Sequence, residues 1–274
     1  MQKFAPLMVA SVLLAAGCAP PPEAPGDLEE LSTFLFAEFE SDSAVLAAGV
    51  TNLETFLLDF ESTATLATDA NRRDRTWSLP VLGYESMDMA DRPADTEFNP
   101  NTQLPVALGI RSAFPGQAHV DLIEFVDQTP VEADSAEEYT RTFTTEAACF
   151  LDASCDRLEV HDVIHRNSPP VLNLVYEQEK HYRHVPYGED GDVAVVSRSW
   201  VDAIYENEED PPDFIDQWFG LNVYIPDGGE TVRYSALWGS SSVSRSFDDD
   251  TLVNLVANGI EESFQNTETY LAAN

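Results

Sequence analysis

The stretch DDDTLVNLVANGIEESFQNTETYLAA, residues 248–273, has the pattern of one long amphipathic helix. Its apolar and small side chains share one face: Val253, Val256, Ile260, Phe264, Thr267 and Leu271. The aspartates at its start suit the positive end of a helix dipole. Gly259, in the interior, costs roughly 1 kcal/mol relative to alanine, and close packing against a sheet would explain it. The stretch therefore predicts a helix that covers a sheet.

The segments ahead of this helix alternate between apolar and polar residues, which is the period expected of strands. They are RLEVHDVIH (157–165), PVLNLVYEQ (170–178), DVAVVSRSWVDAIY (192–205), GLNVYI (220–225) and TVRYSALW (231–238). Turn sequences that contain glycine, YGEDGD and PDGGE, separate the later segments and indicate hairpins. With a further strand predicted at AHVDLIEFV (118–126), we expect a mainly antiparallel sheet of about six strands.

Helices are predicted at three other places. GDLEELSTFLFAEF (26–39) and SDSAVLAAGVTNLETFLLDF (41–60) have apolar residues at helical spacing, and Asp27 is placed to cap the first. Their short connection indicates an antiparallel pair. A third helix is predicted at DSAEEYTRTFTTEAACF (134–150). The predicted fold class is therefore α+β, with residues 27–274 forming a single domain.

An antiparallel sheet closed by a long C-terminal helix resembles the helix-grip arrangement of START-like proteins. In that family a curved sheet wraps the helix around an apolar pocket. The resemblance covers about residues 117–274, and the two helices ahead of the strands depart from the family's usual order. The half-barrel of LolA-type lipoprotein carriers is a second, equally loose resemblance.

The first residues have the plan of a secretory signal, with Lys3 followed by an apolar segment up to Ala16. That segment is too short to cross ~30 Å of hydrocarbon as a helix. LAAGC (14–18) resembles the lipobox of bacterial lipoproteins, where the cysteine is lipidated and becomes the new N-terminus. The alternative is an ordinary secretion signal with an incidental cysteine.

The lipobox resemblance implies a signal peptide at 1–17, lipidation of Cys18 and attachment to a membrane through the lipid. Ala19 behind the cysteine points to the outer membrane, facing the periplasm or the cell exterior. Four prolines follow within residues 19–26 and predict an extended spacer, so residues 18–26 are expected to be a tether. Cys149 and Cys155 then remain, and five intervening residues in an oxidising compartment favour a disulfide over a metal site.

The chain is strongly acidic, with 49 acidic and 14 basic residues and a net charge of −35. Such a surface repels nucleic acid, so no nucleic-acid partner is expected. A solvated acidic face explains the charge more simply than a calcium-binding surface. Asp248–Asp250 lack the alternating ligands of a calcium loop, and helix capping accounts for them. At 43% hydrophobic residues the chain can bury a core.

Candidate catalytic residues are few. HDVIH (161–165) resembles the HExxH motif of zinc proteases, but its surroundings alternate as a strand, which would hold His161 and His165 about 13 Å apart. His181 and His184 could complete a zinc site only through strand pairing. GSSSVSRS (239–246) has no nucleophile elbow and is interpreted as a polar loop. We expect no catalytic, cofactor or metal residues.

These observations favour a lipoprotein whose sheet and last helix enclose a lipid or another small hydrophobic molecule. Two alternatives stay open: a structural or protein-binding envelope component, and a metal-dependent hydrolase that uses His161 and His165. Inward strand positions too small to fill the interior would support a pocket, and Ser197 and Ser199 come closest to that pattern. Arg198, Trp200 and Trp238 also lie on predicted strands, where they could form a pocket wall or part of the core. The oligomeric state is left open.

Overall fold

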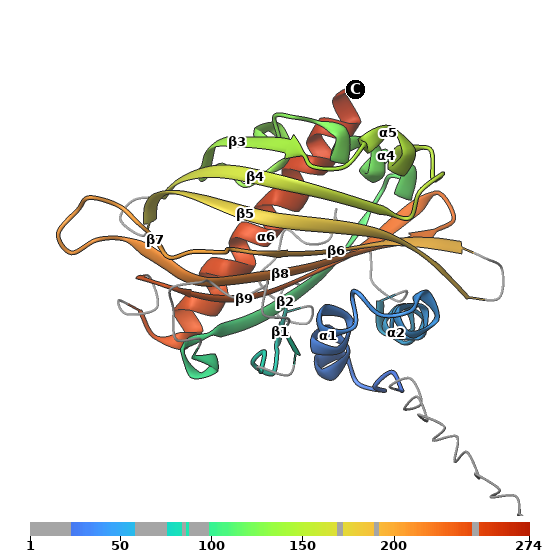
Figure 1. Ribbon diagram of the computed structural model, residues 1–274, viewed down its shortest axis with the longest axis horizontal. Coiled ribbons are helices and arrows are strands. Elements are labelled where there is room, and N and C mark those ends of the chain that lie inside the picture. Colours follow the sequence, from blue (N-terminus) through green and yellow to red (C-terminus); the bar gives the residue numbers. More distant parts are fainter. Residues whose placement is uncertain are drawn as a thin grey trace, which may run out of the picture.

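A computed structural model of the chain describes residues 23–57, 76–83, 86–87, 99–168, 172–188, 192–242 and 247–274. One antiparallel sheet lies between a pair of N-terminal helices and a long C-terminal helix (Figure 1). The fold is thus α+β, as predicted. The predicted signal peptide, Cys18 and the start of the tether lie outside the described residues. In the part of the chain that the structure describes, no helix has the length and apolar character needed to span a membrane.

The sheet runs in the order β1-β2-β9-β8-β6-β5-β4-β3, and β7 adds to β8. The bounds are β1 Thr76–Ser78, β2 Leu104–Ser112, β3 Ala136–Phe143, β4 Arg157–Ser168, β5 Leu172–Tyr187, β6 Asp192–Trp200, β7 Tyr205–Glu206, β8 Phe214–Asp227 and β9 Glu230–Ser241. The five strands predicted between residues 157 and 238 are present, and the neighbouring strands pair antiparallel. The expected size of about six strands is too small, because the described residues form nine.

Two predicted elements are wrong in type. Residues 118–126 form no strand but the helix α4 (Gly116–Asp121) and a 3-10 turn, η5 (Leu122–Glu124), in which His119, Val120 and Ile123 are buried at helical spacing. Residues 134–150 are not one helix but strand β3 followed by the short helix α5 (Ala147–Leu151). The strand was hidden because one of its inward residues is Arg141, which a hydrophobic pattern counts as exposed.

Helices α1 (Leu28–Ala37) and α2 (Ser43–Leu57) pack side by side on one face of the sheet (Figure 1). Asp27 caps α1 as predicted, its Oδ1 accepting a hydrogen bond from the Glu30 amide at 2.8 Å. Phe36 lies edge-on against Phe219 and Trp238, with ring centroids 5.9 and 5.7 Å away. A Cβ at Gly49 would come within 2.7 Å of a Leu35 methyl group, so the glycine permits the close approach of the two helices.

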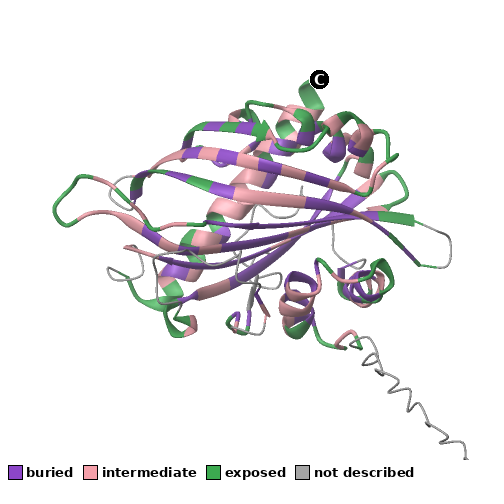
Figure 2. Cartoon of the chain, in the orientation of Figure 1, coloured by how far each residue is buried: buried purple, intermediate pink, exposed green. Residues whose placement is uncertain are grey.

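Helix α6 (Asp249–Ala273) crosses the opposite face of the sheet (Figure 1). Asp248 caps it, accepting a hydrogen bond from the Thr251 amide at 2.8 Å, so the acidic run has the capping role that was expected. Its C-terminal half rests on the 3-10 turn η6 (Thr129–Val131), where the Thr267 hydroxyl donates to the Val131 carbonyl at 3.2 Å. A further turn, η4 (Pro100–Thr102), precedes β2. Figure 2 shows buried residues concentrated along the central strands between the helical layers.

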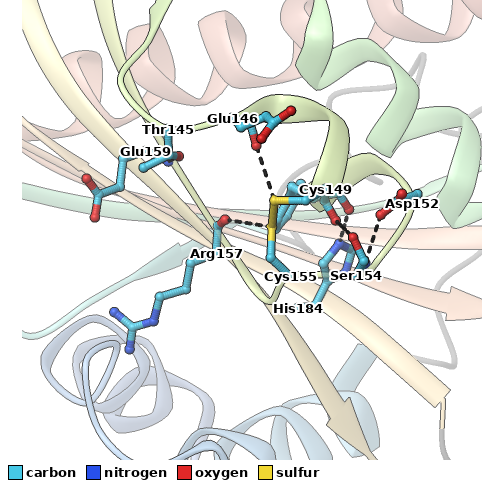
Figure 3. Close-up of a disulfide and its surroundings, with 10 residues drawn as sticks. Thr145, Glu146, Cys149, Asp152, Ser154, Cys155, Arg157, Glu159 and His184 are labelled. Carbon is cyan, nitrogen blue, oxygen red and sulfur yellow. Dashed lines mark hydrogen bonds between the residues drawn. A yellow bond between two sulfur atoms is a disulfide. The ribbon is translucent and has the colours of Figure 1, made fainter.

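Cys149 and Cys155, the pair for which a disulfide was predicted, are joined in the structure. Cys149 in α5 and Cys155 before β4 form a disulfide with a Cα–Cα distance of 5.2 Å, inside the usual range (Figure 3). The loop between them is closed further by hydrogen bonds from the Cys155 amide and the Ser154 hydroxyl to the Cys149 carbonyl. His184 of β5 stacks on Phe150 at 4.1 Å and holds α5 against the sheet. The disulfide thus fastens a short helix at the edge of the domain.

Candidate functional site

A cavity of about 300 Å³ lies between the sheet and α6. Its walls come from strands β2, β3, β4, β5, β6, β8 and β9 on one side and mainly from the first half of α6 on the other. The α6 lining extends from Leu252 to Phe264, which corresponds to about 18 Å of helix at 1.5 Å per residue. The volume is at the lower end of that found for small-molecule sites in proteins.

Much of the cavity wall is apolar. The aliphatic side chains and apolar rings that line it include Leu104, Ile164, Leu172, Trp218, Leu237, Leu252, Leu255, Val256, Ile260 and Phe264. Val256 and Ile260 belong to the predicted buried face of α6, yet both are only half-buried because they face this space. The predicted face of the helix is therefore directed to the sheet, where Ile260 packs against Ile110 of β2 and Val256 borders the cavity.

Small residues keep the space open. Ser199, Gly220, Ser235 and Gly239 line the sheet side of the cavity. Gly259 lines the helix side, and a Cβ placed there would meet no atom within 4 Å. Close packing against the sheet, the predicted reason for this glycine, is therefore wrong. The inward Ser199 that the sequence singled out is a cavity residue, whereas Ser197 is fully buried beside it on β6.

Two arginines near the cavity, the buried Arg141 and the half-buried Arg166, form ion pairs with carboxylates. Arg141 donates from Nε to Asp162 Oδ1 at 2.8 Å, and Asp162 also accepts from the Tyr139 hydroxyl at 2.7 Å. Arg166 donates to the Tyr176 hydroxyl at 2.9 Å and pairs with Glu132 at 3.3 Å. Burial raises the pKa of Asp162, but the Arg141 guanidinium outweighs this and leaves the pKa below its usual range. These two pairs are therefore neutral overall.

Two further cations line the cavity without a carboxylate. Lys180 of β5 and Arg233 of β9 form no ion pair among the described residues, and no described side chain accepts a hydrogen bond from Arg233 Nε or Nη1. The Arg233 guanidinium lies 4.1 Å from the ring centroid of Phe264 and 5.3 Å from that of Tyr224. Lys180 and Arg233 also line a smaller adjoining cavity of about 50 Å³. Lys180 and Arg233 therefore lie in the wall that the two cavities share.

His119 is buried beside Arg233 in the wall of the smaller cavity. Its Nε2 contacts the Ser112 hydroxyl at 2.8 Å, and its ring lies 5.8 Å from that of Tyr224. Burial, together with repulsion from the Arg233 guanidinium, lowers the pKa of His119 from 6.5 to about 2. The imidazole is therefore neutral at physiological pH.

This neutral histidine makes stability dependent on pH. Below about pH 6.5 the unfolded chain takes up a proton at this position and the folded chain does not, so the free energy of unfolding falls by about 1.4 kcal/mol per pH unit. We expect His119→Gln, whose amide can keep the Ser112 contact, to remove this dependence. Urea unfolding at pH 7 and pH 5 should show that the wild type loses roughly 2 kcal/mol more than the variant. If both proteins lose the same free energy of unfolding between pH 7 and pH 5, the lowered pKa of His119 is contradicted.

The histidines of the protease-like motif do not form a metal site. His161 lies between Glu177 and Glu179 at 3.1 and 2.8 Å, whereas His165 lies 3.6 Å from Glu137. His181 is directed to Glu40, and His184 contacts the Phe150 carbonyl. Across the residues described, no group of three metal-ligating side chains is assembled. The strand interpretation of residues 157–165 is confirmed, and it separates these side chains.

The other residues singled out from the sequence fall on both sides of the sheet. Trp200 and Trp238 belong to the core beneath α1 and α2, and Arg198 pairs with Glu40 at 3.2 Å on that side. Within GSSSVSRS, Gly239 and Ser241 end β9 and line the cavity, while residues 243–246 lie outside the described residues. The cavity residues that sequence reasoning missed are the buried cations, because charged residues on a strand are normally expected to face solvent.

No protein-family model and no curated protein matches the sequence. Among solved structures, a protein from Thermus thermophilus matches with a TM-score of 0.41 and 13% identity, covering 62% of this chain and 97% of that one. The STAR-related lipid transfer protein of Xanthomonas axonopodis matches with a TM-score of 0.40, 9% identity, and coverage of 61% and 85%. A START superfamily protein of Mycobacterium smegmatis matches with a TM-score of 0.38 and 9% identity. This match covers 62% of this chain and 97% of that one. Similarities of this size assign the chain to no family.

Proposed function

We propose that the protein binds a small hydrophobic molecule in the cavity between the sheet and α6. The observation that carries the proposal is Gly259. A glycine in a helix interior costs about 1 kcal/mol relative to alanine, yet no atom near Gly259 excludes a larger side chain. An ordinary core residue at this position would fill space that the chain leaves empty. The apolar lining favours a hydrophobic occupant.

The alternatives have less support. A structural envelope component needs no such cavity, and no observation favours it over binding. A metal-dependent hydrolase would require His161 and His165 to share a metal ion. His161 instead lies against Glu177 and Glu179 of β5, and His165 lies against Glu137 of β3.

Filling the cavity from the helix side tests the proposal. We expect Gly259→Leu to raise the stability of α6, because leucine has a higher helix propensity than glycine, and to weaken binding of a neutral probe such as decanol about tenfold or more. Calorimetric titration measures the binding and thermal denaturation measures the stability. Gln265→Leu, on the exposed side of the same helix, is the matched control and should bind decanol as the wild type does. Unchanged decanol binding in Gly259→Leu would place the probe elsewhere and contradict the proposal.

We also propose that the protein is a lipoprotein held at the outer membrane by a lipid on Cys18. The proposal rests on the sequence LAAGC and on the proline-rich residues that follow it. Two acyl chains anchor a protein stably, because each buried methylene contributes about 0.8 kcal/mol. Cys18→Ala should therefore move the protein from the membrane fraction to the soluble fraction when cells are fractionated. A variant that stays with the membrane would refute the lipid anchor.

A further inference from the structure

We propose that the ligand of this cavity carries an anionic head group, a carboxylate or a phosphate, which is bound by Lys180 and Arg233. The inference rests on the proposed binding function and specifies the class of ligand. It follows from the charges in the cavity wall and from the contrast between two kinds of cation there.

The contrast is between cations that are paired and cations that are not. Arg141 and Arg166 are neutralised by Asp162 and Glu132, although the second pair also faces the cavity. Lys180 and Arg233 have no carboxylate within ion-pairing distance among the residues described. The wall that the two cavities share therefore has a surplus of two positive charges.

Arg233 has two hydrogen-bond donors, Nε and Nη1, without an acceptor among the described residues. Its side chain is 6% exposed, so both donors are buried. The cation–π contacts with Phe264 and Tyr224 offset part of the cost of burying the charge, but the aromatic rings supply no oxygen acceptor for the N–H groups. Buried donors without acceptors are rare in native proteins, and a planar fork of N–H groups matches a carboxylate or phosphate.

The cavity has the geometry of an amphiphile site. Tyr224 and Arg233 are cross-strand partners, and Trp218 and Gly239 are partners six residues further along the same two strands. At about 3.3 Å per residue the two pairs are roughly 20 Å apart, and both line the cavity. Arg233 at one end is a cation without a carboxylate. Near Trp218, at the other end, the charged residues Arg166 and Glu132 neutralise each other. A hydrocarbon chain directed toward Trp218 would bring its head group to Arg233.

The acidic surface does not oppose this assignment. Exposed charges are screened beyond about 8 Å at physiological salt, whereas buried charges are screened much less. An anion inside the cavity is therefore subject mainly to Lys180 and Arg233.

Titration with three probes that share one alkyl chain tests the inference: decanoate, decyl phosphate and decanol. The full chain carrying Cys18→Ala is purified without detergent, and binding is measured by calorimetry. We expect at least one anionic probe to bind ~10-fold or more tightly than decanol. The tighter of the two anions identifies the head group. Lys180→Met and Arg233→Met should each reduce the ratio of anion affinity to decanol affinity severalfold.

Arg157→Met is the matched control, because it removes one positive charge from an exposed position on another part of the sheet. It should keep the anion preference. Thermal denaturation of each variant shows that it is folded, and Lys180→Met provides the test should Arg233→Met fail to fold. Equal binding of all three probes would overturn the anion assignment and leave the proposed function standing. Preference retained in both cavity variants would overturn the assignment to these residues, and binding of no probe would contradict the proposed function itself.

Discussion

Asp162→Ala is expected to lower the free energy of unfolding by about 3–5 kcal/mol, the usual cost of removing one partner of a buried ion pair. Asp162 is fully buried, and it accepts hydrogen bonds from Arg141, Tyr139 and Gln178 at 2.7–3.3 Å. Without it the Arg141 guanidinium, 3% exposed, is left as an uncompensated charge in the interior. Urea unfolding at neutral pH measures the loss, which is a large share of the stability of a typical domain.

The matched comparison is the double variant Arg141→Met with Asp162→Leu. Replacing both members of a buried pair by apolar side chains avoids the unpaired charge, so this protein should be more stable than Asp162→Ala alone. A double variant as unstable as the single one would show that the carboxylate matters through Tyr139 and Gln178 and not through Arg141. An Asp162→Ala protein as stable as the wild type would contradict the pair as the structure has it.

Phe36→Ala should cost about 3–5 kcal/mol, because it removes a large, fully buried side chain and leaves a cavity between α1 and the sheet. Its ring contacts Phe219 of β8 and Trp238 of β9. Helix α1 is therefore expected to unfold together with the sheet. Phe56→Ala, at a position that is 39% exposed on α2, is the control and should change stability by no more than about 0.5 kcal/mol. Equal effects of the two substitutions would mean that α1 is not docked as described.

Elements with strong local signals were predictable from the sequence. The helices α1, α2 and α6 have apolar residues at helical spacing with an aspartate before α1 and α6, and the strands of the later meander alternate cleanly. Elements that bury charge were not predictable. Strand β3 directs Arg141 inward, and α4 buries His119, so in both segments the polar residue points away from solvent and the hydrophobic pattern fails.

The candidate site was predictable only in outline. Small inward residues such as Ser199 are compatible with a cavity, and Ser199 does line it, but a serine on a strand is equally common on a polar surface. The charged part of the wall depends on cross-strand register: Lys180 lies opposite Ser199, and Arg233 lies opposite Tyr224. That register is set by long-range pairing of β5, β6, β8 and β9, which local pattern does not specify.

The proposed function requires a ligand in the space between the sheet and α6. A crystal structure of the chain with a long-chain alcohol brominated at its terminal carbon tests this most directly, since anomalous scattering locates the bromine. We expect the bromine inside the cavity, which Val256 and Gly259 of α6 and Trp218 of β8 line. Bromine found only on the outer surface, with α6 packed directly on the sheet and no space beneath Gly259, would contradict the proposed function.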